Sequence, residues 1–205
     1  MQSIKYTSTL KNGKLDLPII DLPEGTIVEV ILLVQDVESK PINLLSDKNI
    51  NYQELEQLLK SKQWRKADEL TSKIMCMIMD REEKGMLNVE HMNNFPCQDL
   101  RTINELWVNN SNGKFGFSVQ KELLLSLGGT IDKNGDGFDY DIWKKFGAKT
   151  DWLYQTADWK THEDFMRETN DGQSALRASL PYKVCRGLGI WCISSLPQRL
   201  IDCNI

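Results

Sequence analysis

FPCQDLRTINELWVNNSNGKFGFSVQ, residues 95–120, is the stretch from which the organisation of the whole chain can be argued. Phe95-Pro96 closes the preceding segment, because a residue before proline is pushed out of helical geometry. Beyond it, apolar residues recur three and four positions apart, which predicts a helix with one buried face. These residues are Leu100, Ile103, Leu106 and Trp107.

Turn and capping signals bound this expected helix and start the next one. Asp99 can accept backbone amides that the first helical turn leaves unpaired. The SNG sequence at residues 111–113 is a stop signal, because asparagine and glycine adopt the left-handed C-terminal cap. We expect Ser118 to cap a helix that continues to Leu127. Gly116, between two phenylalanines, lets a backbone or a ligand approach closely.

The same run resembles the signature of the genomes-uncoupled-four family, the porphyrin-binding regulators of magnesium chelatase in oxygenic phototrophs. The segments DLRTI, ELW, SNG and FGFSVQ stand in order and without a gap. Further matches lie upstream at residues 64–71 and downstream at Trp143, at residues 180–181 and at residues 191–196. The resemblance covers residues 49–205 and implies a compact, mostly α-helical domain that binds a tetrapyrrole.

Composition argues against several classes of protein. The 205 residues are 40% hydrophobic and 26% charged, which is typical of a soluble globular protein. The net charge of −4 provides no basic field that would attract nucleic acid, and no apolar run approaches the roughly 18–20 residues that span a bilayer. The five cysteines form no CxxC pair, so we expect reduced thiols in a cytoplasmic protein rather than disulfides or a zinc site.

The first forty residues predict a small all-β module. Strands are expected at residues 4–10, 15–19 and 26–34. The pattern resembles AbrB-like and antitoxin-like swapped hairpins, which implies a homodimer formed through residues 1–40. Many such modules bind DNA, but four lysines against six acidic residues leave a charge of −2, which opposes phosphate binding. Nucleic acid is therefore a disfavoured partner, and residues 41–48 are expected to be a linker.

Residues 49–205 predict the helical domain. An amphipathic helix is expected at residues 64–79, with Asp68 and its charged neighbours facing water. Five of the seven methionines lie between residues 75 and 92. Their spacing fits core packing, whereas their flexible thioethers would also suit the wall of a site for a broad, flat ligand.

Metal and catalytic patterns are weak. Asp132–Asp136 resembles the first half of a calcium loop, but the position that needs a bidentate glutamate holds Trp143, which favours an ordinary turn. His91 and His162 have no second ligand at a metal-binding spacing, so we expect them to face solvent or to be hydrogen-bonded. No catalytic triad and no phosphate-binding glycine loop is present, so the sequence proposes neither an enzyme nor a metal site.

The C-terminal segment brings cations close to apolar residues. Residues 172–201 contain four cations and no acidic residue, although the protein as a whole is acidic. A porphyrin needs apolar surface for its ring and cations for its two propionates. We therefore expect Arg177 and Arg186 to pair with propionates; the alternatives are a solvated loop and phenylalanines that belong to the core. The resemblance implies the remaining ligand contacts: Leu87, Phe115, Phe117, Val119 and a covering Leu180.

The resemblance implies a non-catalytic regulator. It would bind protoporphyrin IX and Mg-protoporphyrin IX, contact the large subunit of magnesium chelatase and stimulate chlorophyll biosynthesis. It would be cytoplasmic, at the periphery of photosynthetic membranes. Ala178-Ser179 stands where the family usually has Gly-His, which favours the alternative of a signalling or scaffold module that kept the fold without porphyrin binding. A tetrapyrrole-sensing, DNA-binding regulator is the third interpretation.

Overall fold

The computed structural model describes residues 42–131, 139–188 and 194–205, together with Pro23. Over these residues the chain is α-helical, with one isolated antiparallel bridge between Leu153 and Trp159. This confirms the mostly helical fold that was expected for residues 49–205. The strands expected within residues 1–40 lie outside the described residues, so the β module and the dimer remain predictions.

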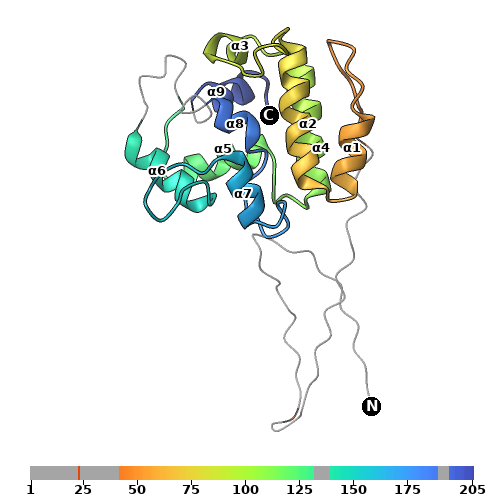
Figure 1. Cartoon of the computed structure of the whole chain (residues 1–205). Coiled ribbons are helices and arrows are strands. Elements are labelled where there is room, and N and C mark those ends of the chain that lie inside the picture. The colour runs from red at the N-terminus through yellow and green to blue at the C-terminus, as the bar shows by residue number, and fades with distance from the viewer. Residues whose placement is uncertain (1–22, 24–41, 132–138, 189–193) are drawn as a thin grey trace. The chain divides into compact units, whose positions relative to one another are not determined.

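Figure 1 shows α1, α2 and α4 side by side, with the later helices gathered against them. None of the helices in the described part of the chain has the length and apolar character needed to cross a membrane. The helices are α1 (Gln53–Lys60), α2 (Trp64–Ile78), α3 (Val89–Asn93), α4 (Cys97–Asn110), α5 (Phe117–Ser126), α6 (Tyr140–Lys149), α7 (His162–Glu168), α8 (Lys183–Leu188) and α9 (Ser195–Asp202).

Helix α4 ends where the sequence predicts. Its last residue is Asn110, and Asn112 and Gly113 then take the left-handed values φ 53° and φ 74°. Its core face is also the expected one, because Leu100, Ile103 and the following apolar residues are buried. The periodicity and the stop signal therefore sufficed to define the buried face and the end of this helix.

The expected cap at Asp99 is wrong. Helix α4 begins at Cys97, and the fully buried Asp99 carboxylate instead accepts a hydrogen bond from the Tyr52 hydroxyl at 2.8 Å and from the Asp47 amide at 3.0 Å. The Ser46 hydroxyl donates to the same carboxylate. Burial, and then the bond to Asp99, raise the pKa of Tyr52 far above its usual value, so Tyr52 remains a donor. Asp99 thus fastens residues 46–52 to α4.

The expected cap at Ser118 is also wrong. Helix α5 begins at Phe117 after Gly116, and the Ser118 side chain accepts no capping bond. The amide of Ser118 donates instead to the Asn104 side-chain oxygen at 2.8 Å. An amide side chain of α4 therefore satisfies the first turn of α5, and the two helices of the signature are joined directly.

The core is centred on aromatic rings from distant segments. Trp64 stacks on Trp107 at a centroid distance of 6.1 Å, and Phe115 lies edge-on to Trp64 at 5.2 Å. The indole of Trp107 donates to the Thr71 hydroxyl at 3.0 Å. A second group of rings packs around Tyr182, and it comprises Trp152, Phe165 and, through Trp152, Phe146.

Asp68 does not face water, as the helical pattern predicted, but is completely buried. Its carboxylate accepts the Tyr182 amide at 2.9 Å and the Lys183 amide at 3.0 Å, and it lies 3.0 Å from His162 Nε2. A buried carboxylate is tolerated only when several donors replace its water. The side chain of α2 therefore supplies the N-terminal amides of α8 with their acceptor.

The expectation of reduced cysteines is wrong. Cys97, the first residue of α4, forms a disulfide with Cys203, which follows α9. Cys185 is disulfide-bonded as well, and Cys76 is free and buried. The pairing of Cys97 with Cys203 joins residues 106 positions apart, and a partner at that distance is set by the fold rather than by any local spacing.

We expect Asp68→Ala to lower the free energy of unfolding by about 2–4 kcal/mol, because two buried amides and His162 lose their acceptor. Urea denaturation followed by circular dichroism measures the change. Glu69→Ala is the matched control, since the neighbouring carboxylate is partly exposed and its removal should cost no more than about 0.5 kcal/mol. An equal loss in both variants would refute the special role of Asp68.

Candidate functional site

The segment 178–183 is hydrogen-bonded to the signature sequence through residues 178, 180 and 181. The Ala178 amide donates to the Lys114 carbonyl at 2.9 Å, and the Gly116 amide donates to the Leu180 carbonyl at 2.9 Å. The Gln120 side-chain amide donates to the Pro181 carbonyl at 2.9 Å. Hydrogen bonds from the FGFSVQ motif therefore fix the position of the segment before α8.

The other side of the same segment is bonded to the chain between α6 and α7. The indole of Trp152 donates to the Ser179 carbonyl at 2.9 Å, and the Ser179 hydroxyl donates to the Thr150 carbonyl at 2.7 Å. Ala178 and Ser179 are both fully buried. These two residues thus have structural partners of their own, and Lys183 enters α8 with its backbone fixed.

A hollow lies between α2, the segment before α3 and α8. It has about 230 Å³ of empty space, part of which is open to solvent. Its lining is apolar apart from one hydroxyl, one thiol and one ammonium group. The lining residues are Ser72, Cys76, Gly85, Met86, Leu87, Lys183, Val184 and Gly187.

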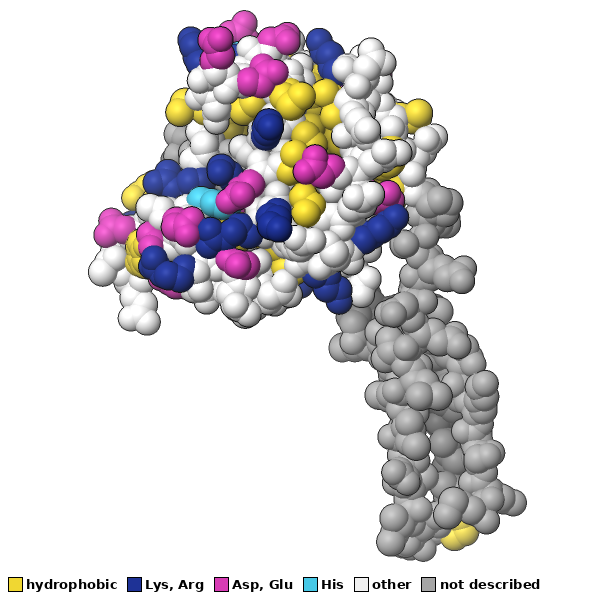
Figure 2. Space-filling view, turned by 45° about the vertical axis from the view of Figure 1, so that its right-hand side comes forward, with side chains coloured by type: hydrophobic (Ala, Val, Ile, Leu, Met, Phe, Trp, Pro, Cys, Tyr) yellow, Lys and Arg dark blue, Asp and Glu magenta, His cyan; other side chains and the backbone are white. Residues whose placement is uncertain are grey.

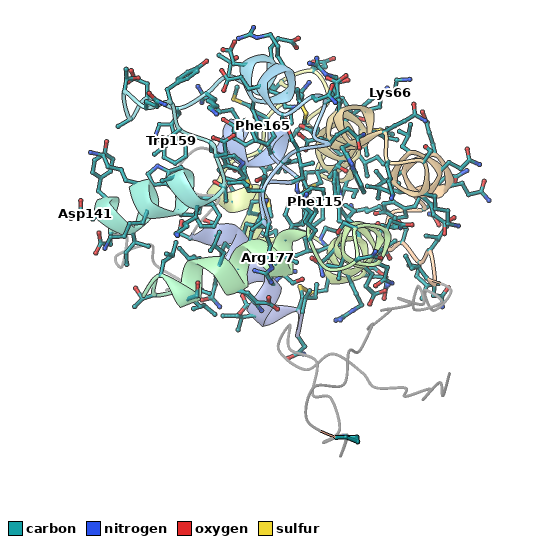
Figure 3. The ribbon with its side chains drawn as sticks, turned by 90° about the horizontal axis from the view of Figure 1, so that it is seen from below. Lys66, Phe115, Asp141, Trp159, Phe165 and Arg177 are labelled. Carbon is teal, nitrogen blue, oxygen red and sulfur yellow. A yellow bond between two sulfur atoms is a disulfide. The ribbon has the colours of Figure 1, made fainter. Side chains whose placement is uncertain are left out.

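The apolar residues predicted to contact a ligand lie in two places. Leu87 lines the hollow. Phe115, Phe117 and Leu180 are at most 1% exposed, and Val119 is 4% exposed. In Figure 3, Phe115 lies among the side chains between the helices. The phenylalanines of the motif therefore belong to the core, and their role is to hold the segment that leads into α8.

The two predicted arginines have protein partners. Arg177 Nη2 lies 2.7 Å from Glu122 Oε2 of α5 in an exposed ion pair. Arg186 Nε donates to the Lys160 carbonyl at 3.1 Å. Neither arginine lines the hollow. The structure thus does not bring Arg177 and Arg186 to the apolar surface that Leu87 and Met86 provide.

Lys183 is the cation that sequence reasoning passed over. Its side chain is exposed and lines the hollow. Among the described residues its ammonium group has no ion-pair partner. The two arginines that the sequence favoured are both bonded, Arg177 to Glu122 and Arg186 to the Lys160 carbonyl. Lys183 was one of the four cations in the acid-free segment, but only the start of α8 shows which of them reaches the apolar wall.

The remaining polar patterns have structural explanations. His91 completes a capping box at the start of α3, where its amide donates to Asn88 Oδ1 at 3.0 Å. His162 lies beside Asp68, so both histidines are hydrogen-bonded, as the sequence predicted. The described residues contain no cluster of three side chains that could hold a metal ion. Asp132–Asp136 lies outside them.

Charges of both signs are interspersed on the face of the helical unit that Figure 2 shows, with hydrophobic side chains between them. One ion-pair group joins segments far apart in the chain, and a second lies within residues 151–168. Arg65 contacts Glu163 at 2.9 Å and Asp171 at 2.6 Å. The buried Lys160 contacts both Asp151 and Glu168 at 2.8 Å. Mixed charges of this kind give little long-range attraction to a polyanion.

The chain is similar to one protein family and to several curated proteins. The model of the GUN4-like family matches residues 45–199. A Ycf53-like protein of Synechocystis sp. (strain ATCC 27184 / PCC 6803 / Kazusa) is 36% identical over 109 residues, which are 52% of this chain and 43% of that protein. A chloroplastic tetrapyrrole-binding protein of Arabidopsis thaliana is 31% identical over 75 residues, 36% of this chain and 28% of that protein. The chain therefore spans less than half the length of these relatives.

Solved structures share the helical fold. GUN4 from Chlamydomonas reinhardtii superposes with a TM-score of 0.58 at 23% identity, covering 78% of this chain and 93% of that chain. The ligand-free structure of Arabidopsis thaliana GUN4 superposes with a TM-score of 0.50 at 21% identity, covering 77% and 96%. At sequence identities this low, the structural similarity shows a shared fold and nothing further.

We expect Gly116→Ala to destabilise the protein by about 1–3 kcal/mol more than Gly113→Ala does. Both glycines have positive φ, but a Cβ at Gly116 would lie 2.7 Å from Val108 Cγ2, whereas Gly113 has open space. The backbone strain is also larger at Gly116, because φ 130° with ψ 158° is almost exclusive to glycine whereas φ 74° at Gly113 lies in the left-handed region. The difference between the variants therefore measures this strain and the close approach together. Thermal denaturation of the two variants measures it, and equal melting temperatures would contradict the assignment.

Alkylation of Cys76 provides a second test of the site. Burial raises the pKa of the Cys76 thiol, Glu82 adds to the rise and Arg81 opposes it, so little thiolate is present at pH 8. We expect iodoacetamide to modify Cys76 at least about tenfold more slowly in the folded protein than in urea. Peptide mass spectrometry follows the reaction. Equal rates would show that the thiol is freely accessible in the hollow.

Proposed function

The chain belongs to the GUN4-like family, and on that premise we propose that its helical unit binds a tetrapyrrole. The observation that carries the proposal is the hollow beside α8, which is lined by the apolar residues Met86, Leu87 and Val184 together with the cationic residue Lys183. A tetrapyrrole with propionates has the matching chemistry, an apolar ring and carboxylates at one edge. The named relative from Arabidopsis thaliana supports the same ligand class.

The size of the hollow determines how the ligand binds. Sites that enclose a drug-sized ligand occupy about 300–1,000 Å³, whereas the enclosed part of the hollow is about 20 Å³ and the rest of its space opens to solvent. The hollow therefore does not enclose a macrocycle, and the ring would lie against its apolar rim with most of its surface outside. Met86, whose side chain is 57% exposed, stands at the rim, where a flexible thioether can follow the ring face.

The ligands proposed are protoporphyrin IX and its magnesium complex. The residues that line the hollow include no histidine and no carboxylate, and these are the usual protein ligands of a metal at the centre of such a ring. Recognition would thus depend on ring shape and on the propionates. Discrimination between the free and the magnesium-bound porphyrin would then be weak.

The proposed role is a non-catalytic one. A ligand that lies mostly outside the hollow can be transferred to or from a second protein, which suits a carrier that regulates magnesium chelatase through its large subunit. The place of action would be the cytoplasm at the periphery of photosynthetic membranes. Membership of the family supports this role, and the ion-paired, evenly charged surface gives no support to the alternative of a nucleic-acid partner.

We expect Lys183→Gln to weaken binding of a soluble protoporphyrin analogue by about three- to tenfold. An exposed ion pair contributes up to about 1 kcal/mol and a charged hydrogen bond about 1.5 kcal/mol. Quenching of tryptophan fluorescence, with and without magnesium in the ring, gives the dissociation constants. Glu122 already neutralises Arg177, so Arg177→Gln is the matched control and should change affinity less than about twofold.

The same series includes Arg186→Gln, because Arg186 lies one helical turn from Lys183 on α8. A larger effect for Arg177→Gln than for Lys183→Gln would return the propionate site to the arginine inferred from the sequence. Absence of saturable binding by the unmodified protein would reject the tetrapyrrole proposal. The helical unit would then be a signalling or scaffold module.

A further inference from the structure

The disulfide between Cys97 and Cys203 joins the beginning of α4 to the end of α9. Cys97 is the first residue of α4, and Cys203 immediately follows the last residue of α9. The Cα atoms are 5.2 Å apart. The bond is the covalent part of an attachment that also includes Arg101, whose guanidinium donates to the Cys203 and Asn204 carbonyls. The position of α9 against α4 therefore depends in part on the oxidation state of two cysteines.

Helix α9 in turn holds α3 in place. The two helices pack against each other and lie close together in Figure 1. Arg199 of α9 donates from Nε to the carbonyl of Phe95 at 2.7 Å. Phe95 is fully buried and follows α3 by two residues. A five-residue helix has little stability of its own, so α3 keeps its place through the helix that packs on it.

The start of α3 is the wall of the hollow. Gly85, Met86 and Leu87 line the hollow, and the next residue, Asn88, is the N-cap of α3. The Asn88 side chain accepts the His91 amide, and the Asn88 amide donates to the His91 ring. A displacement of α3 would thus move the capping box and, directly with it, the residues that form the apolar wall.

We propose that the Cys97–Cys203 disulfide stabilises the position of residues 85–87, which line the hollow, in a redox-dependent way. Its reduction would loosen the packing of α9 and α3 and weaken ligand binding in the hollow. The proposal rests on the proposed function for its ligand. It assigns to the disulfide an effect on a site formed by other helices, α2 and α8. The bonds of Arg101 and Arg199 remain after reduction, so the expected change is local loosening and not unfolding.

The chemistry is thiol–disulfide exchange with a dithiol reductant. Cys203 is 3% exposed and Cys97 is half-buried, so attack at Cys97 Sγ is the accessible route. One thiolate of the reductant bonds to Cys97 Sγ and releases the Cys203 thiolate. The second thiol of the reductant then displaces Cys97 and closes the reductant's own disulfide. Two electrons and two protons pass from the dithiol to the protein, which ends with two thiols.

Hydrogen exchange of the full chain tests the link without a ligand. The Cys97→Ser, Cys203→Ser double variant should exchange the α3 amides, including those of His91 and Met92, about fivefold or more faster than the oxidised protein, the low end of typical coupling between sites. Amides of α7 are the internal control and should be unchanged. Recovery of a peptide pair linked through Cys97 and Cys203 from the oxidised protein establishes the bond first, and its absence would overturn the proposal.

The double variant also separates this disulfide from the one that contains Cys185. A dithiol should accelerate α3 exchange in the unmodified protein but should add nothing in the double variant. The protoporphyrin analogue should bind the oxidised protein about fivefold more tightly than the double variant. Equal exchange of α3 in both forms would refute this redox-dependent stabilisation. Absence of binding to the oxidised protein would reject the proposed function, whereas a difference in α3 exchange would still support redox-dependent stabilisation of α3.

Discussion

The buried carboxylate of Asp68 is the contact on which the packing of α2, α7 and α8 depends. Removing a carboxylate from water costs several kcal/mol, and only correctly placed donors offset that cost. Here the donors are the Tyr182 and Lys183 amides and the ring of His162, which come from the start of α8 and from α7. The Asp68 carboxylate therefore specifies how α2, α7 and α8 pack, because its burial without these donors would be strongly unfavourable.

The hollow follows from that contact by helical geometry. Ser72 and Cys76 come one and two turns after Asp68 on α2, and Gly187 comes one turn after Lys183 on α8. Once Asp68 fixes the two helices at one end, their next turns must face each other. The glycine leaves room between the helices where a larger side chain would fill it. The hollow thus lies next to the Asp68 contact, between the same two helices. The FGFSVQ motif contributes indirectly, because it is hydrogen-bonded to Leu180 and Pro181, which lead into α8.

Sequence periodicity predicted the helices well and their polar contacts poorly. Helix α2 was expected at residues 64–79 and is found at Trp64–Ile78, because its buried stripe repeats locally. Asp99 and Ser118 were assigned as caps because a cap is a local rule, but their partners are supplied by residues 46–52 and by Asn104. Asp68 carried a usable signal, since it lies four residues after Trp64 and three before Thr71, on the buried face. No local sequence signal pairs Cys97 with Cys203, because they lie 106 positions apart. The sequence also does not distinguish Lys183 from the neighbouring arginines; only the position of α8 shows that Lys183 lines the hollow.

The same disulfide changes the connectivity of the chain. Because it joins residues separated by 106 positions, it closes a covalent ring that contains all the helices from α4 to α9. A protease that cuts the backbone once inside this ring opens it without producing two molecules, since the sulfur bridge keeps the pieces joined. A cut between α2 and α4 has no such protection. In its oxidised form the protein therefore consists of a covalently closed ring, residues 97–203, and a linear N-terminal segment that precedes it.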